Sequence, residues 1–462
     1  MWGLSGGQLL AIGVAASVFG PSAMTAGTRG LVATAPVWGT ALLFAFLRPH
    51  GRTLVAWTPI VANWILRRTR GQNAALRRPD RPRPAGTLAL PGEVGALRLY
   101  RHGPTTTAMI HDPHRRTLTA VMRLRYPAFL LLGQDDRNRR VQGWGQALSG
   151  ACRTGRISRV QVLERTTADG GEAVHAYWRD AGNSDTGSAS ASYEDLITTA
   201  GPASARHETL LALTMSIKHS ARAIRTAGGG LAGAATVLIK ELSAVTANLR
   251  SAEIGVDSWL DEAELALLIN TAFNPGRGPV WDRTGHGRGL AVAGPMAVTA
   301  AWDHLRCDET WHAVFWVREW PREDVDATFL SPLMLTNSVQ RSVSVIYRPR
   351  TTREAMKDVR VEQTEQESEQ RRRDKHDIRT TAAQQRERDD VDRRERELVA
   401  GHADLAFTGL ISVSAGTKED LDAAIEETEG ACHQSGLDTV LLYGQQDAAF
   451  YAAALPLGRV LI

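Results

Sequence analysis

The sequence predicts an α+β protein with an α/β-type cytoplasmic body built from ferredoxin-like units. A two-helix transmembrane hairpin is expected before this body, and a charged helical hairpin is expected to interrupt it. Three observations support this fold class: an almost uncharged N-terminus, an alternation of apolar strands with amphipathic helices, and a highly charged segment over residues 351–400.

The N-terminal 48 residues predict the hairpin. Leu9–Ala26 and Gly30–Leu47 carry no charged side chain, and each is close to the 20 or so residues that cross a bilayer. The turn between them, around Arg29, is short enough for an antiparallel pair. A cleaved signal peptide would need a basic n-region, which is missing before the first apolar run. A pair of buried core helices remains the other interpretation.

Arginines follow the apolar runs at once, and they set the orientation of the hairpin. The residues expected to be membrane-proximal and basic are Arg48, Arg52, Arg67, Arg68 and Arg70. Juxtamembrane Lys and Arg stay in the cytoplasm. We therefore expect a two-pass protein of the cell membrane with the bulk of the chain cytoplasmic. The net charge of +4 then indicates contact with anionic membrane lipid.

Residues 49–85 are expected to form a basic juxtamembrane segment and a Pro/Arg linker. Within this range, Trp57, Ile60, Val61, Trp64 and Ile65 recur at helical spacing. The pattern fits an amphipathic helix at the membrane interface. It fits a helix packed on the body equally well.

Residues 86–350 are expected to form the body and residues 401–462 to complete it. Strands are expected over Leu88–Leu99, Ala108–Leu132 (short strands, with a polar turn at His111–Arg116), Ile157–Glu164, Thr209–Ile217, Val298–Leu305, Trp311–Val317, Val343–Tyr347, Phe407–Val413 and Thr439–Tyr443. Helices are expected over Arg137–Cys152, Ala232–Arg250, Asp261–Phe273, Lys418–Cys432 and Asp447–Leu455. The Gly/Ser/Asp-rich stretch Thr166–Ser190 is expected to be a loop. Residues 351–400 predict a charged helical pair inserted into the body, or a solvated connector.

The sequence predicts no catalytic residue, no cofactor-binding residue and no metal ligand. Gly228–Gly233 fits a dinucleotide-binding pattern, but a strand must run directly into its first glycine, and ten residues intervene. His304, Cys307 and His312 suggest zinc, yet they fall in an expected hairpin turn. No P-loop motif occurs. Three widely spaced cysteines do not make a disulfide framework. The aromatic run around Phe315 is typical of a central strand.

The chain resembles a group of actinobacterial integral membrane proteins encoded in conjugation and type IV secretion loci. The resemblance rests on Trp302–His304, Trp311–Trp316, Glu319–Arg322, His207–Glu208, Gly228–Gly230 and Thr271–Pro275. The C-terminal motifs Gly401–Ala403, Gly444–Phe450 and Leu455–Arg459 are similar to the end of the non-motor, N-terminal domain of type IV secretion ATPases. The two-helix anchor resembles the small membrane subunit encoded beside such ATPases.

This resemblance implies a non-enzymatic, membrane-anchored scaffold that docks a separately encoded P-loop motor ATPase and can form a homo-oligomer. One alternative is a membrane subunit of a type VII secretion apparatus. Another is a DNA-binding accessory factor of conjugal transfer, which rests on the arginine runs near residues 67–83 and 371–373. An enzyme with an unrecognised site is the remaining alternative.

Overall fold

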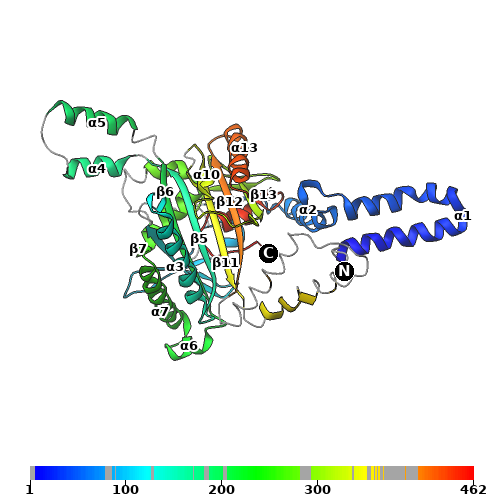
Figure 1. Ribbon diagram of the computed structural model, residues 1–462, viewed down its shortest axis with the longest axis horizontal. Helices are drawn as coiled ribbons and strands as arrows, with labels where there is room; N and C mark the ends of the chain where they lie inside the picture. The colour runs from blue at the N-terminus through cyan, green and yellow to red at the C-terminus, as the bar shows by residue number, and fades with distance from the viewer. Residues whose placement is uncertain are drawn as a thin grey trace.

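The structure is a computed structural model. It describes residues 6–78, 86–88, 90–125, 129–169, 171–181, 187–200, 205–280, 293–335, 338–350, 355–357, 359–361, 363–364, 368, 391 and 404–461. The body is built on one large antiparallel sheet, with an apolar helical hairpin extending from one side (Figure 1). The α+β class predicted from the sequence is confirmed.

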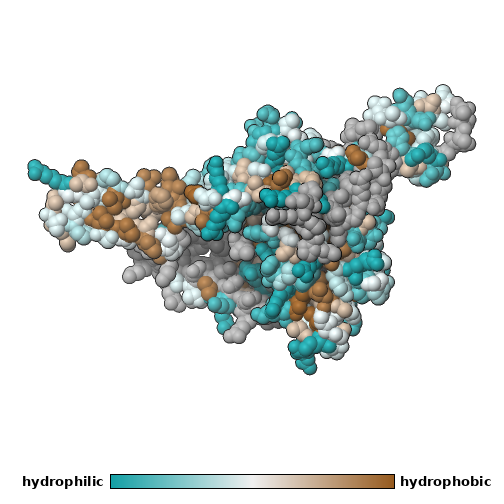
Figure 2. All heavy atoms as spheres, turned by 180° about the vertical axis from the view of Figure 1, so that it is seen from behind, coloured by the Kyte–Doolittle hydropathy of each residue, from teal (hydrophilic) through white to brown (hydrophobic). Residues whose placement is uncertain are grey.

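The N-terminal hairpin is a single α-helical run, α1 (Gly6–Phe46), that reverses direction at Gly27. Gly27 has φ 55° and ψ −138°, a conformation that favours glycine. Contacts between the arms show that they run antiparallel: the Phe19 and Trp38 rings lie 5.6 Å apart edge to face, and the Gln8 amide donates to the Ala45 carbonyl at 2.8 Å. Each arm has about 20 residues and is therefore roughly 30 Å long. The apolar surface of the hairpin is exposed (Figure 2).

The first half of the body is a β-α-β-β-α-β unit. Its elements are β4 (Thr117–Arg125), α3 (Gln134–Cys152), β5 (Ile157–Ala168), β6 (Ala205–Ser216), α7 (Gly230–Ser251) and β7 (Gly255–Trp259). The strands lie in the order β7-β4-β6-β5, and all neighbours are antiparallel. Both helices pack on one face of the sheet, with Leu148 and Leu238 in the same core. This is the ferredoxin-like topology.

The second half repeats the same topology. Its elements are β10 (Thr310–Glu319), α10 (Ser331–Met334), β11 (Gln340–Pro349), β12 (Leu405–Ala415), α13 (Lys418–Gln434) and β13 (Asp438–Leu441), with strand order β13-β10-β12-β11. Each unit has a bulge at the same place, between Met122 and Leu124 in β4 and between Val317 and Glu319 in β10. The ferredoxin-like units expected from the sequence are therefore present, and they form an internal duplication.

The two units join edge to edge through β5 and β11 to make a 13-stranded sheet of the described strands. Short meanders extend it at both ends: β2 (Arg98–Arg101) and β3 (Ala108–Asp112) at one end, and β8 (Ala297–Ala300), β9 (Leu305–Cys307) and β1 (Ala74–Leu76) at the other. Helices α8 (Glu262–Phe273) and α14 (Gln446–Ala453) each follow the last strand of a unit. Both contribute to one core on the face opposite α3, α7 and α13.

Buried Gln161, at the centre of this face, binds the backbone of the segment from Ala452 to Gly458 through hydrogen bonds. Its amide nitrogen donates to Ser344 and to the carbonyls of Ala452 and Leu455, at 2.9 to 3.1 Å. Its amide oxygen accepts from the backbone N–H of Gly458 at 2.8 Å. A buried amide must satisfy its donors and acceptor, and here each has a partner.

Each unit carries an insertion between its second and third strands. In the first unit these are α4 (Glu172–Ala181) and α5 (Ser188–Ala200), which project from the body on the side away from α1 (Figure 1). In the second unit residues 350–404 connect β11 to β12, and these two strands pair with each other. Most of the expected charged hairpin lies outside the described residues.

Several sequence predictions were wrong in detail. Thr166–Ser190 is not a loop: β5 continues to Ala168, and α4 follows. Val298–Leu305 is two strands, β8 and β9, rather than one. Within residues 49–85 the expected helix is present as α2 (Leu54–Thr69), whereas the strand β1, which pairs with β8, was not expected. The short helices not mentioned so far are η1 (Pro49–Gly51), η2 (Gly92–Val94), η3 (Phe129–Leu131), α6 (Ala221–Thr226) and η5 (Pro275–Arg277).

Candidate functional site

Helix α2 joins the apolar hairpin to the body. Thr53 caps its N-terminus by accepting from the backbone N–H of Ala56 at 3.4 Å. The helix then presents Trp57 and Trp64 to Trp302 of the body, with ring centroids 5.9 and 5.2 Å from it. Trp57 is only 8% exposed and Trp64 is half-buried, so both rings pack against the body. Of the two interpretations of this helix, packing on the body is the one observed.

The membrane-proximal arginines divide into two groups. Arg67 forms a bidentate ion pair with Asp447 in the first turn of α14. Hydrogen bonding to Asp447 raises the pKa of Arg67 above its ordinary value, against the opposing effect of burial. Arg52 lies 5.4 Å from the ring centroid of Trp316, and burial lowers its pKa. Both side chains face the body rather than lipid.

The other three arginines point outward. Arg48, Arg68 and Arg70 are exposed, and Arg68 lies over the exposed side of Trp64 with 5.1 Å between guanidinium carbon and ring centroid. No acidic residue occurs before Asp80. We call the contact between α2 and the body the joint. Its outward side is thus cationic, and it also carries the exposed apolar residues Ile65 and Leu66.

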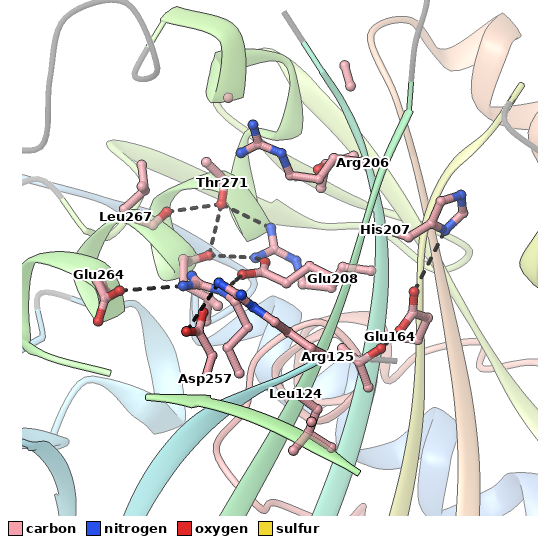
Figure 3. Close-up of a pocket in the computed structure, with 18 residues that line it drawn as sticks. Leu124, Arg125, Glu164, Arg206, His207, Glu208, Asp257, Glu264, Leu267 and Thr271 are labelled. Carbon is pink, nitrogen blue, oxygen red and sulfur yellow. Dashed lines mark hydrogen bonds and ion pairs between the residues drawn. The ribbon is translucent and has the colours of Figure 1, made fainter. Parts of the chain in front are cut away.

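A charged pocket of about 1070 Å³ lies farther along the sheet, where β4 and β5 end and β6 begins (Figure 3). Glu208 is at its centre and receives Arg123 Nε at 2.7 Å and Arg165 Nη1 at 3.5 Å. Arg123 also reaches Glu264 at 3.4 Å. Burial acts to lower the pKa of Arg123, but Glu208 and Glu264 outweigh it and the pKa is raised.

Arg165 is the most buried charge in this pocket, at 2% exposure of its side chain. Its Nη2 donates to the Thr271 hydroxyl at 3.0 Å and its Nη1 to the Leu268 carbonyl at 3.4 Å, so α8 helps to hold it. Burial lowers its pKa, against the attraction of Glu208. Such partners offset the large free-energy cost of burying a guanidinium, which remains charged in proteins.

Hydroxyls and an imidazole gather around Glu164 at one side of the pocket. The Thr209 hydroxyl donates to Glu164, and His207 Nδ1 lies 3.7 Å from the same carboxylate and 3.4 Å from the Thr166 hydroxyl. The paired guanidiniums and carboxylates link the ends of β4 and β5 to the start of β6 and to α8.

The residues that suggested zinc lie around the β9–β10 turn. His312 is fully buried; its Nε2 donates to the Phe273 carbonyl at 3.0 Å and its Nδ1 lies 2.8 Å from the Ser414 hydroxyl. Burial lowers its pKa to about 4, so the ring is neutral. His304 pairs with its neighbour Asp303. Within the described part of the chain, no three His, Cys, Asp or Glu side chains form a group that could hold a metal.

The other candidate motifs have structural roles. Gly228–Gly230 turns the chain between α6 and α7, all three glycines have positive φ, and helix α6 rather than a strand runs into the turn. The Phe315 strand is central, paired with β12 on one side and with β9 and β13 on the other. All three cysteines are free and buried. Burial raises the pKa of Cys152 to about 12 and of Cys432 to about 11, so neither is a reactive thiolate at neutral pH.

Sequence reasoning missed both the Asp447 partner of Arg67 and the Arg123–Glu208–Arg165 network. Arg67 and Asp447 are 380 positions apart in the sequence, and no local pattern connects them. The network has a weak signal: Arg123, Arg165 and Glu208 are charges within otherwise apolar strands, where an unpaired charge would be costly.

The comparisons with known proteins concern the second part of the first unit and the beginning of the second. The family model described as "Putative type VII ESX secretion system translocon, EccE" matches residues 203–317, from β6 to β10. No curated protein matches the chain. The matched range covers about a quarter of the sequence and includes Glu208 and Glu264 of the charged pocket. This similarity indicates a secretion-system component and favours type VII over the type IV and conjugation origin expected from the sequence.

Proposed function

We propose that this chain is a membrane-anchored, non-enzymatic subunit of a type VII-like secretion translocon. The observation that carries the proposal is the EccE match over residues 203–317, within a body joined to an apolar hairpin. The exposed hairpin is suited to lipid, and the folded body is suited to binding other subunits. The resemblance to type IV and conjugation components then reflects a related architecture.

In this proposal α1 crosses the cell membrane twice and leaves the body in the cytoplasm. Two features support it: each arm is about 30 Å long, matching the hydrocarbon core, and both ends of the hairpin meet at α2. The contacts of Gln8 with Ala45 hold those ends together. Exposed Arg48 lies at the base of the hairpin, and exposed Arg68 and Arg70 lie at the C-terminal end of α2; near a membrane surface each would gain about 1 kcal/mol from anionic lipid.

The proposed protein partner is a P-loop motor ATPase encoded separately, held near the membrane by the body. The charged pocket and the projecting α4–α5 pair offer polar and apolar contact surfaces, respectively. Tyr177 and Leu196 on that pair are 71% and 57% exposed. The DNA-binding alternative has less support, because Arg67, the first arginine of the run on which it rests, is paired with Asp447 of the body.

A secretion assay tests this function. Deleting the gene should abolish export of the small proteins that the neighbouring locus secretes, and the full chain should restore it. A chain lacking residues 6–46 should accumulate in the cytoplasm and fail to restore export. Normal export without the gene, or full rescue by the truncated chain, would contradict the proposal. Nucleotide turnover by the purified chain alone would contradict its non-enzymatic part.

A further inference from the structure

A second cavity lies at the opposite ends of the same central strands, where β4 and β5 begin. Its volume is about 660 Å³, within the range of small-molecule sites. Three guanidiniums line it, from Arg115, Arg159 and Arg348, and no carboxylate among the residues that the structure describes does so. Hydroxyls of Thr117, Ser158 and Thr408 line it as well. In contrast to the first pocket, charges of one sign gather here.

The sheet register places like charges opposite each other in this cavity. Val160 of β5 pairs with Tyr347 of β11, so the next position along sets Arg159 opposite Arg348. Like charges directly across two strands are destabilising. Burial, followed by the charges of Arg115, Arg348 and Arg459, lowers the pKa of Arg159. The arrangement therefore costs free energy while the cavity holds no counter-charge.

The neighbouring carboxylate does not neutralise the three arginines. Asp112 accepts from Arg459 Nη2 at 2.6 Å and from the backbone N–H groups of His114 and Arg115 at 3.0 Å. Among the described residues, no acidic side chain forms an ion pair with Arg115, Arg159 or Arg348, and Arg159 Nε is buried without a hydrogen-bond partner. Buried donors of this kind normally have an acceptor.

We propose that this cavity binds a phosphate-bearing anion through the guanidiniums of Arg115, Arg159 and Arg348. Guanidinium pairs with phosphate oxygens in a planar, bidentate geometry, and each such bond is charge-assisted. Thr117 and Thr408 supply additional hydroxyl donors, whereas Ser158 already donates to the Thr214 carbonyl at 3.1 Å. The ligand is either a soluble phosphorylated molecule or the phosphate of an anionic lipid headgroup. This inference does not depend on the secretion role.

Thermal unfolding of the full chain tests the site in two arms. In neutral detergent, pyrophosphate is titrated at constant ionic strength with chloride as the balancing anion. In nanodiscs, phosphatidylglycerol is compared with phosphatidylcholine. The variants are Arg159→Gln and Arg348→Gln, and the matched control is Arg101→Gln, an exposed arginine on edge strand β2. Without phosphate, both cavity variants should melt at or above the wild-type temperature, because like-charge repulsion is relieved.

We expect the ligand to raise the melting temperature of the wild type and of Arg101→Gln, and to bind each cavity variant at least about tenfold more weakly. A rise in melting temperature with pyrophosphate, but not in phosphatidylglycerol discs, identifies a soluble ligand. A rise in melting temperature that occurs only in phosphatidylglycerol discs, and that Arg159→Gln abolishes, identifies a lipid headgroup. The proposal is overturned if neither anion stabilises the wild type. It is also overturned if the anion raises the melting temperature of Arg159→Gln and Arg348→Gln as much as that of the Arg101→Gln control.

Discussion

Arg67 on α2 and Asp447 on α14 form a bidentate ion pair that joins the anchor helix to the last helix of the body. Their side chains are 19% and 11% exposed. Trp57 and Trp64 of the same helix pack on Trp302, so the apolar hairpin is joined to the body by both polar and aromatic contacts. The anchor is therefore an integral part of the fold and not a flexible tether.

Removing either partner of this ion pair should destabilise the joint. A charge-assisted pair shielded from water contributes more than an exposed one, and the partner that remains loses its counter-charge. A double-mutant cycle of Arg67→Ala and Asp447→Ala should give a coupling free energy of about 2 kcal/mol in thermal unfolding. Arg70→Ala, on the same helix but exposed, should change stability by no more than about 0.5 kcal/mol. Additive effects of the two substitutions would argue against a coupled pair.

The aromatic half of the joint should be the stronger half. Trp57→Ala removes a nearly buried indole, and we expect a loss of about 3 kcal/mol in the free energy of unfolding. Ile65→Ala, at a position 50% exposed on the same helix, is the control and should lose far less in detergent. Equal losses at the two positions would mean that α2 does not pack as described.

The buried imidazole of His312 should make stability depend on pH. Its folded-state pKa of about 4 lies below its ordinary value of 6.5, so the unfolded chain binds more protons between these two values. Stability is therefore fully present above pH 6.5 and falls as the pH drops toward 4, by up to about 3 kcal/mol. Unfolding free energies measured across this range should show the slope in the wild type. His312→Gln should flatten this dependence of unfolding free energy on pH. An unchanged slope in that variant would mean that other titrating groups cause the dependence.

The turn of the hairpin should be reachable from outside the cell. Thr28→Cys lies next to Gly27, where α1 reverses, and it should react with a membrane-impermeant maleimide on intact cells. Thr69→Cys, at the exposed end of α2, should react only after permeabilisation. The native thiols are buried, which keeps the background low. Labelling of Thr69→Cys but not of Thr28→Cys on intact cells would reverse the proposed orientation.

Much of the fold follows from local patterns. Apolar strands such as Ala313–Val317 and capped helices such as α8, where Asp261 and Glu264 form a capping box, have signals within a few residues. Strand β7 was missed because Gly255–Trp259 is short and has only half-buried or exposed residues. Helices α4 and α5 were missed because Gly, Ser and Asp surround them.

The site was harder to predict, because its geometry depends on long-range pairing. Exposed and buried arginines look alike in the sequence: Arg67 and Arg68 are adjacent, yet one pairs with Asp447 and the other faces outward. The facing positions of Arg159 and Arg348 arise only when β5 meets β11 at the junction of the two units. Such relationships are set by the topology of the whole sheet.

The central claim is that this chain acts as a subunit of a membrane secretion complex. The most direct measurement is affinity purification of the tagged full chain from detergent-solubilised membranes after mild cross-linking, with its partners identified by mass spectrometry. We predict recovery of the other membrane proteins of a type VII-like translocon together with a P-loop ATPase. Recovery of the chain from membranes without such partners, under conditions that keep other membrane complexes intact, would contradict the account.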